Sequence, residues 1–257
     1  MQPKTILITG ATSGIGRHAA LHLLARGHRV IATGRREELL RELEAEAADT
    51  RLTTLRLDVC DPDAIAAAVI EVDQQTDGYG IDVLVNNAGY AQGGAVLDVP
   101  LEAVRRQYET NVFGLLAATR AFVPRMFERG SGRIVNISSM AGRFTLPTTG
   151  VYNSTKYAVE ALSDAMRVEC KAWGIDVVLI EPGAIKTNFN DTLKGSVDSE
   201  TPETGRWRAA YREFAKVMDR TQPLAHGPKP VSKAISKAVE ARSPSARYIA
   251  PVADAFT

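Results

Sequence analysis

The sequence predicts an α/β fold, a single doubly wound parallel sheet of about seven strands with helices on both faces. Two observations carry this prediction. Short apolar runs rich in β-branched residues alternate with longer segments of helical periodicity, which is typical of buried parallel strands joined by helices. Glycine-rich or polar segments follow most of these runs, at the carboxyl ends of the strands, where open α/β sheets bind their ligands.

Composition indicates the size and class of the protein. The 257-residue chain fits one domain, and its 31 Lys and Arg balance 30 Asp and Glu, so the charge favours neither nucleic acid nor an acidic membrane surface. Two cysteines make neither a disulfide framework nor a metal site, and the four histidines lack ligand spacing. The N-terminus lacks the pattern of a signal peptide, and no apolar run approaches a membrane span. We therefore expect a single-domain cytoplasmic protein over residues 1–257 that binds no metal and no nucleic acid.

The first strand, helix and strand form a compact unit. Thr5–Thr9 is a β-branched apolar run, Arg17–Arg26 is helical, and Arg29–Thr33 is the second strand. The loop between the first two lets backbone approach a pyrophosphate, and the helix N-terminus adds free N–H groups and a positive dipole end. The unit predicts a dinucleotide site rather than an ordinary glycine-rich turn, with cofactor-binding residues Gly10, Thr12, Ser13, Gly14, Ile15 and Gly16.

The residues after the second strand indicate which dinucleotide binds. An NAD-binding domain carries an acidic residue about 20 residues beyond the glycines, where it binds the ribose 2′-hydroxyl. Gly34 stands at that place, whereas Arg35 and Arg36 suit a 2′-phosphate by charge and by fork geometry. These residues favour NADP(H) over NAD(H). The alternative is that both arginines are merely solvated at the start of a helix over Glu37–Ala48.

Two further strands end in short polar motifs. Leu52–Leu57 is followed by Asp58-Val59, and Ile81–Val85 is followed by Asn86-Asn87-Ala88-Gly89. Between them lies a helix over Asp63–Gln75, begun by an Asp-Pro pair that suits a first turn. The small residues of the asparagine motif let the chain pass close to a cofactor, and its amides can brace the sheet. By itself the motif is also compatible with a simple polar turn.

A long helical segment, Leu101–Phe127, is interrupted only around Pro124 and carries Asn111 in its interior. Asparagine competes with the helix backbone for hydrogen bonds, so this position requires a reason. The fifth strand, Gly132–Ile137, then ends at two serines. We interpret the first, Ser138, as a structural residue of the strand end and the second, Ser139, as a candidate catalytic residue.

Tyr152 and Lys156 are the central pair of the chain. Residues four apart share one helix face, so a phenol and an ammonium form a possible acid–base unit at the start of a helix over Ser154–Trp173. The lysine charge favours the phenolate and is expected to lower the tyrosine pKa. The spacing alone also fits an incidental pair on a solvated helix. The remaining strands are expected at Ile175–Ile180 and Tyr248–Ala250.

Together these motifs resemble the short-chain dehydrogenase/reductase family. The G-x-x-x-G-x-G loop, the Asn-Asn-Ala-Gly run, a serine 13 residues before Tyr152 and the Tyr-x-x-x-Lys pair occur in the family's order. The resemblance covers roughly Thr5–Thr187 and is greatest to hydroxysteroid- and retinol-dehydrogenase-like members. It implies a Rossmann-type sheet and reversible hydride transfer between NADP(H) and a carbonyl or secondary alcohol.

The resemblance also implies residue roles. Tyr152 exchanges a proton with the substrate oxygen, Lys156 supports it and binds the nicotinamide ribose, and Ser139 donates a hydrogen bond to that oxygen. Asn111 holds a water that links the lysine to solvent; the structural alternative is a helix-bending amide. Helices that carry Asn111 and Tyr152 pair in the family, which implies a homodimer or homotetramer. Further cofactor contacts are expected at Asp58, Val59, Asn87, Ala88, Gly89, Pro182, Gly183, Ile185 and Thr187.

The segment at about 188–230 lies outside the resemblance and is expected to form a substrate lid. Trp207, Tyr211, Phe214 and Met218 recur at the spacing of one helix face, which predicts an apolar inner surface and a lipophilic small-molecule substrate. Phe144 and Phe189 favour the same pocket. The alternative is that the stripe only packs on the domain. For the whole protein, alternatives are a cofactor-sensing regulatory protein on the same fold, and epimerisation or dehydration by the same residues.

Overall fold

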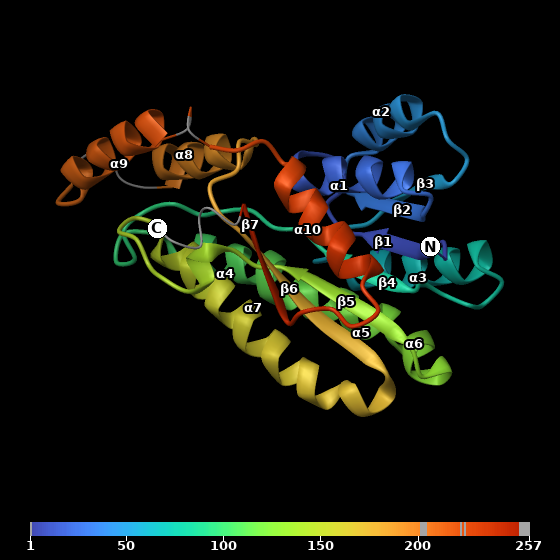
Figure 1. Cartoon of the computed structure of the whole chain (residues 1–257). Coiled ribbons are helices and arrows are strands. Elements are labelled where there is room, and N and C mark those ends of the chain that lie inside the picture. Colours follow the sequence, from blue (N-terminus) through green and yellow to red (C-terminus); the bar gives the residue numbers. More distant parts are fainter. Residues whose placement is uncertain (1, 201–204, 222, 224, 252–257) are drawn as a thin grey trace.

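The computed structural model describes residues 2–200, 205–221, 223 and 225–251. The strands in this part of the chain form one parallel sheet in the order β3-β2-β1-β4-β5-β6-β7 (Figure 1). The order in which strands are added to the sheet reverses between β1 and β4. At such a point the carboxyl ends of the two neighbouring strands border a crevice. The strands are β1 (Thr5–Ile8), β2 (Arg29–Gly34), β3 (Leu52–Arg56), β4 (Val83–Asn86), β5 (Gly132–Ile137), β6 (Ile175–Pro182) and β7 (Arg247–Ala250). The predicted doubly wound parallel sheet is confirmed.

Helices cover both faces of the sheet because the buried strands are apolar on both sides. Ile6 and Ile8 point to one face and Leu7 to the other, as the two-residue period of a strand requires. The first face is covered by α1 (Gly14–Ala25), α2 (Glu37–Ala47) and α10 (Lys229–Glu240). The second face is covered by α3 (Pro62–Gln75), α5 (Leu115–Phe122) and α7 (Gly150–Glu169).

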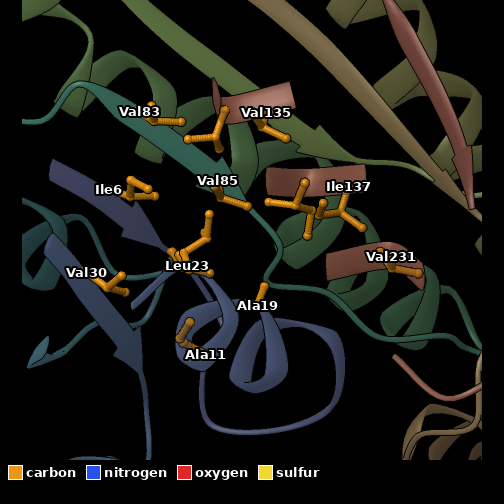
Figure 2. Packing of buried hydrophobic residues seen from close by; sticks show 14 of the residues in the cluster. Ile6, Ala11, Ala19, Leu23, Val30, Val83, Val85, Val135, Ile137 and Val231 are labelled. Atoms are coloured by element: carbon orange, nitrogen blue, oxygen red, sulfur yellow. The ribbon is translucent and has the colours of Figure 1, made fainter. Parts of the chain in front are cut away.

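The core under α1 shows how the glycine loop is held in place. Figure 2 shows Ala19 and Leu23 of α1 beside the strands that carry Ile6 and Val85, and all four side chains are fully buried. This packing sets the N-terminus of α1 at the carboxyl end of β1. The helix begins at Gly14, three residues before the sequence predicted, so the loop itself supplies the first helical turn.

The long segment after β4 is less regular than predicted. It divides into α4 (Leu101–Tyr108), a π-helical turn η1 (Glu109–Gly114), α5 and α6 (Pro124–Arg129). The sequence predicted an interruption around Pro124, and the structure starts α6 there, where the missing N–H of proline is unpaired in any case. The π-helical turn was not predicted, and Asn111 lies within it. Such turns interrupt helices most often at functional sites.

The segment after β6 forms two helices at one end of the sheet (Figure 1). They are α8 (Phe189–Glu200) and α9 (Arg208–Thr221); residues 201–204, 222 and 224 of the expected lid lie outside the described part. Side chains fasten both helices to the loop after β4. The Ser196 hydroxyl accepts a hydrogen bond from Gly93 N at 2.8 Å, and the Tyr211 hydroxyl donates to Asp98 Oδ2 at 2.5 Å. An ion pair between Lys194 and Asp219 joins the two helices.

Candidate active site

A cleft of about 1000 Å³ opens at the carboxyl ends of the central strands. It brings together almost every predicted site residue, from segments far apart in the sequence. Two predicted residues are not on its wall: Gly16 and Asn111 lie behind it. The predicted residues on the wall are Gly10, Thr12, Ser13, Gly14, Ile15, Arg35, Arg36, Asp58, Val59, Asn87, Ala88, Gly89, Ser139, Tyr152, Lys156, Pro182, Gly183, Ile185 and Thr187.

The glycine loop is tied to the asparagine motif. Gly10 has a φ of +66°, and a Cβ there would lie 2.8 Å from Ala88 Cα, so no larger residue fits this approach. Asn87 Nδ2 donates to Thr9 O at 2.9 Å and to Gly10 O at 3.0 Å. The Thr9 hydroxyl in turn accepts from the backbone N–H groups of Asn87 and Ala88. Thr9 was missed by the sequence analysis, because a threonine at a strand end carries no distinctive signal.

The asparagine motif also braces the sheet, as predicted. Asn86 Nδ2 donates to Asn136 Oδ1 on β5 at 2.9 Å and to the Thr119 hydroxyl at 2.8 Å. Asn136 continues the chain of buried hydrogen bonds to Ser163 on α7. These amides hold β4, β5 and the catalytic helix in fixed relation.

At one end of the cleft, Arg35 and Arg36 stand where the sequence predicted a phosphate contact. The Arg35 side chain is 73% exposed, and its Nη1 lies 3.9 Å from Asp58 Oδ2, so its guanidinium is accessible to a ligand. A Cβ on Gly34 would lie 2.5 Å from Thr12 Cγ2. An acidic side chain at position 34 therefore could not be accommodated unless Thr12 moved.

Tyr152 and Lys156, the predicted catalytic pair, lie in the first two turns of α7, which begins at Gly150 rather than at the predicted Ser154. Tyr152 and Ser139 both line the cleft, and the Ser139 hydroxyl donates to Pro182 O at 3.4 Å. Ser139 follows β5 and is oriented by the hydrogen bond that its hydroxyl accepts from Ala141 N at 3.1 Å. Lys156 Nζ lies 5.9 Å from the Tyr152 ring centroid and donates to Ile137 O at 2.8 Å.

Burial dominates the ionisation of this pair. It raises the pKa of Tyr152 to about 12, against which the hydrogen bond from Ser139 acts. It also lowers the pKa of Lys156 to about 8, which the charge of Glu160 opposes. The prediction that the lysine would lower the tyrosine pKa is therefore wrong for this structure. Desolvation of the phenolate outweighs an ammonium that is directed toward a backbone carbonyl.

Asn111 is almost fully buried, and its amide is occupied. Its Oδ1 accepts from Tyr90 N at 3.1 Å, while its Nδ2 donates to Tyr90 O at 2.9 Å and to the Thr155 hydroxyl at 3.1 Å. These bonds fasten the loop after β4 to the catalytic helix. Both amide hydrogens are used in these bonds. A water-holding role for Asn111 stays a prediction.

The opposite end of the cleft is apolar. Phe189 and Leu193 from α8, and Phe214 and Met218 from α9, line it. The other half of the predicted stripe does not line the cleft. Trp207 and Tyr211 pack with Ala95 and Val197, away from the cleft wall, and Phe144 is 46% exposed and also not on the wall.

One residue beside the catalytic tyrosine was missed. Asn153 is buried, and its Nδ2 donates to Ala141 O at 2.9 Å and to Phe144 O at 2.8 Å. It thereby fixes the loop between Ser139 and the catalytic helix. Its position next to Tyr152 was the only available signal.

The described residues contain no group of three or more His, Cys, Asp or Glu side chains placed to hold a metal ion. None of the helices described is both long and apolar enough to cross a bilayer.

Comparison with known proteins agrees with this arrangement of motifs. The family model described as short chain dehydrogenase matches residues 4–197. The chain belongs to the short-chain dehydrogenase/reductase family. The resemblance drawn from the sequence is thus confirmed, and with it membership of a family of oxidoreductases.

Relatives in this family include proteins of different origin. Dehydrogenase/reductase SDR family member 7B of Bos taurus is 40% identical over 215 residues, 78% of this chain and 66% of that protein. NADPH-dependent 3-dehydrocapnine reductase of Ornithobacterium rhinotracheale is 35% identical over 248 residues, 95% of this chain and 86% of that protein. Among solved structures, the closed form of serine dehydrogenase complexed with NADP+ has a TM-score of 0.83 at 31% identity, covering 95% of this chain and 93% of that one.

Proposed function

We propose that this protein is an NADP(H)-dependent oxidoreductase that interconverts a lipophilic carbonyl compound and the corresponding secondary alcohol. The observation that carries this proposal is that Tyr152, Lys156 and Ser139 line one wall of a cleft whose ends differ in chemistry. One end presents arginines and the other presents aromatic and aliphatic side chains.

The residues of the first end fit a nicotinamide dinucleotide phosphate. The Gly10 turn leaves room that a Cβ would fill, and the N-terminus of α1 points its unpaired N–H groups at the loop. Arg35 and Arg36 suit the 2′-phosphate, and Gly34 leaves no carboxylate to repel it. The relatives named with NADPH or NADP+ support the same preference. When bound, this cofactor supplies or accepts the hydride.

The protein's own side chains then handle the proton. In reduction, Tyr152 donates its proton to the carbonyl oxygen as negative charge develops there. Ser139 donates a hydrogen bond to the same oxygen, and its own orientation is set by Ala141 N. Lys156, when protonated, supplies a positive charge 5.9 Å from the Tyr152 ring centroid, although burial still dominates the Tyr152 pKa. In oxidation the same groups act in reverse.

The substrate class follows from the apolar end of the cleft. Phe189, Leu193, Phe214 and Met218 offer a surface that favours a steroid-, retinoid- or long-chain-like molecule over a sugar or hydroxy acid. The Tyr152 ring lies against Phe189, so an apolar substrate would contact both the proton donor and the lid.

We also propose that the protein assembles as a homodimer or homotetramer through α4, η1, α5 and α7. Large apolar side chains are exposed on these elements: Leu101 at 65%, Phe113 at 55%, Tyr157 at 43% and Val168 at 77%. Burial of such a surface against a second copy would be favourable.

The test is a screen of ketones and alcohols with NADPH and NADH, followed at the nicotinamide absorbance. The proposal expects turnover of bulky apolar carbonyls with NADPH. Tight NADPH binding without turnover of any carbonyl or alcohol would favour a cofactor-sensing protein instead.

A further inference from the structure

A buried ionic cluster lies beside the catalytic lysine, and the proposed mechanism does not use it. Arg247 Nε lies 3.1 Å from Glu160 Oε2 and 3.2 Å from Glu181 Oε1. The side chain of Glu181 is fully buried, and that of Glu160 is 11% exposed. Two carboxylates on one guanidinium in the interior are costly unless further charge compensates them.

Glu160 lies one helical turn from Lys156 on the same face of α7. The atoms around Gly142 show that these residues lie close together. A Cβ on Gly142 would lie 3.0 Å from Ser138 Oγ, 3.1 Å from Glu160 Cγ and 3.1 Å from Lys156 O. Lys156 Nζ donates to Ile137 O, the residue before Ser138. The ammonium and the carboxylate therefore flank the same short stretch of chain at the end of β5.

Hydrogen bonding within this region is incomplete. Glu160 Oε1, Glu181 Oε2 and Ser138 Oγ are buried and have no hydrogen-bond partner. A buried carboxylate oxygen without a donor depends on nearby positive charge for its stabilisation. For Glu160, that charge comes from Arg247 on one side and Lys156 on the other.

The other charged groups around Glu160 are already engaged with one another. Arg143, just after η2 (Met140–Gly142), donates to Glu181 Oε1 at 2.7 Å. Arg247 Nη2 donates to Asp164 Oδ2 at 2.6 Å, and Arg167 pairs with the same Asp164. Arg247 is therefore divided among three carboxylates, so Lys156 is the cation of this region without an acidic hydrogen-bond partner among the contacts described.

We propose that Glu160 is a positioning residue for the hydride-transfer reaction, whose carboxylate keeps Lys156 in the ammonium form inside the buried site. This inference rests on the proposed oxidoreductase function. Burial favours loss of the Lys156 proton, and Glu160 is the charge that opposes this loss. Lys156 is already the group of the Tyr152–Lys156 pair that loses its proton first, and without Glu160 it would lose that proton at lower pH. Tyr152 would then face a neutral amine, and no positive charge would offset the phenolate that forms during reduction.

The consequence appears in the pH dependence of reduction. The active form carries a protonated Tyr152 and a charged Lys156, so activity falls as pH rises through the first deprotonation of the pair. Replacing Glu160 by Gln favours lysine deprotonation and moves this alkaline limb to lower pH. Glu160→Asp keeps the charge, so the midpoint of its alkaline limb should stay close to that of wild type.

The experiment compares kcat/KM for carbonyl reduction against pH in wild type, Glu160→Gln, Glu160→Asp and Glu181→Gln. We expect the midpoint of the alkaline limb to fall by about half a pH unit or more in Glu160→Gln. Glu181→Gln is the matched control, because it removes a buried carboxylate from the same Arg247 without facing Lys156. It should lower the melting temperature and leave the midpoint in place. An unchanged midpoint in Glu160→Gln, or an equal shift in Glu181→Gln, would overturn the proposal.

A second readout does not depend on turnover. In protein labelled at the lysine ε-carbon, the Lys156 signal is assigned by its loss in Lys156→Arg and titrated by NMR. The Lys156 pKa should be about half a pH unit or more lower in Glu160→Gln than in wild type. A change below about 0.2 unit contradicts the role of Glu160, even if no substrate is ever found. If Glu160→Gln does not fold, Glu160→Asp must show a smaller shift in the same direction.

Discussion

The ring of Tyr152 meets the ring of Phe189 edge-on, with centroids 5.2 Å apart and planes inclined by 66°. Tyr152 belongs to the catalytic helix α7, and Phe189 is the first residue of α8. The proposed proton donor and the proposed lid are thus in direct contact. Movement of the lid would therefore change both the entrance to the site and the surroundings of the phenol.

Two aromatic residues of the predicted stripe lie in different surroundings: Phe214 belongs to α9, and Trp207 lies just before it. Phe214→Ala should reduce kcat/KM selectively for a bulky apolar ketone, because Phe214 lines the cleft. Removing its contact area is expected to cost roughly tenfold or more for that substrate, while a small polar ketone is little affected. Steady-state kinetics with both ketones measures the difference.

Trp207→Ala is the matched control, because Trp207 packs with Ala95 and Val197 away from the cleft. It should lower the melting temperature and reduce activity on both ketones alike. If the two variants behave identically, the apolar residues of α9 serve only for packing and the lipophilic-substrate proposal loses its support.

Cofactor preference is tested at Arg35. Arg35→Asp should weaken NADPH binding far more than NADH binding, because a charge-assisted contact to the 2′-phosphate is replaced by repulsion. One such contact is worth about 1.5–3 kcal/mol, so the ratio of the two Kd values should change by roughly tenfold or more. Arg41→Asp, an equally exposed arginine that pairs with Glu37 along α2, should leave the ratio unchanged. Equal effects of Arg35→Asp on both cofactors are incompatible with the assignment.

The buried lysine has a consequence for stability. Burial lowers the pKa of Lys156 from its ordinary 10.5 to about 8, so the unfolded chain binds this proton more tightly than the native protein. Between these values unfolding takes up a proton, and the native state gains stability as the pH rises. Relative to Lys156→Met, wild type should gain on the order of 2 kcal/mol in unfolding free energy between pH 8 and 9.5.

Urea unfolding of both proteins at several pH values measures this difference. Measurements below pH 10 avoid ionisation of Tyr152, whose pKa is raised to about 12. A constant difference between wild type and Lys156→Met across this range would mean that Lys156 keeps its ordinary pKa in the folded protein.

Much of the fold and site could be predicted because their signals are local. Gly10 and Gly14 adopt positive φ values in the loop, and Tyr152 and Lys156 share a helix face through simple spacing. Their convergence follows from the rule that parallel strands present their carboxyl ends on one edge. Most residues of the predicted cofactor and catalytic sites therefore line one cleft, and their roles stay predictions.

The features that escaped prediction depend on tertiary contacts. The π-helical turn around Asn111 follows from its hydrogen bonds to Tyr90 and Thr155, which no local pattern reveals. The stripe from Trp207 to Met218 has one helical period, yet half of it packs on the loop after β4, where the Tyr211 hydroxyl donates to Asp98. Periodicity identifies an apolar face but not which neighbour each part of it meets.

Assembly is tested on η1. Phe113 is 55% exposed there, and a charge at its position should oppose pairing of the long helices. Phe113→Asp should reduce the mass measured by light scattering to that of a monomer. Ile70→Asp, at an equally exposed apolar position on α3, should leave the mass unchanged. A monomeric wild type would contradict the proposed assembly.

The most direct test of the proposed mechanism is the turnover number of Tyr152→Phe. This change removes the phenolic hydroxyl and leaves the ring in contact with Phe189. We expect carbonyl reduction to be abolished while NADPH binds with nearly unchanged Kd. Tyr157→Phe, on the exposed face of the same helix, should retain full activity. If Tyr152→Phe keeps about a tenth or more of the wild-type kcat, a loss below roughly 1.4 kcal/mol of barrier lowering, Tyr152 is not the proton donor.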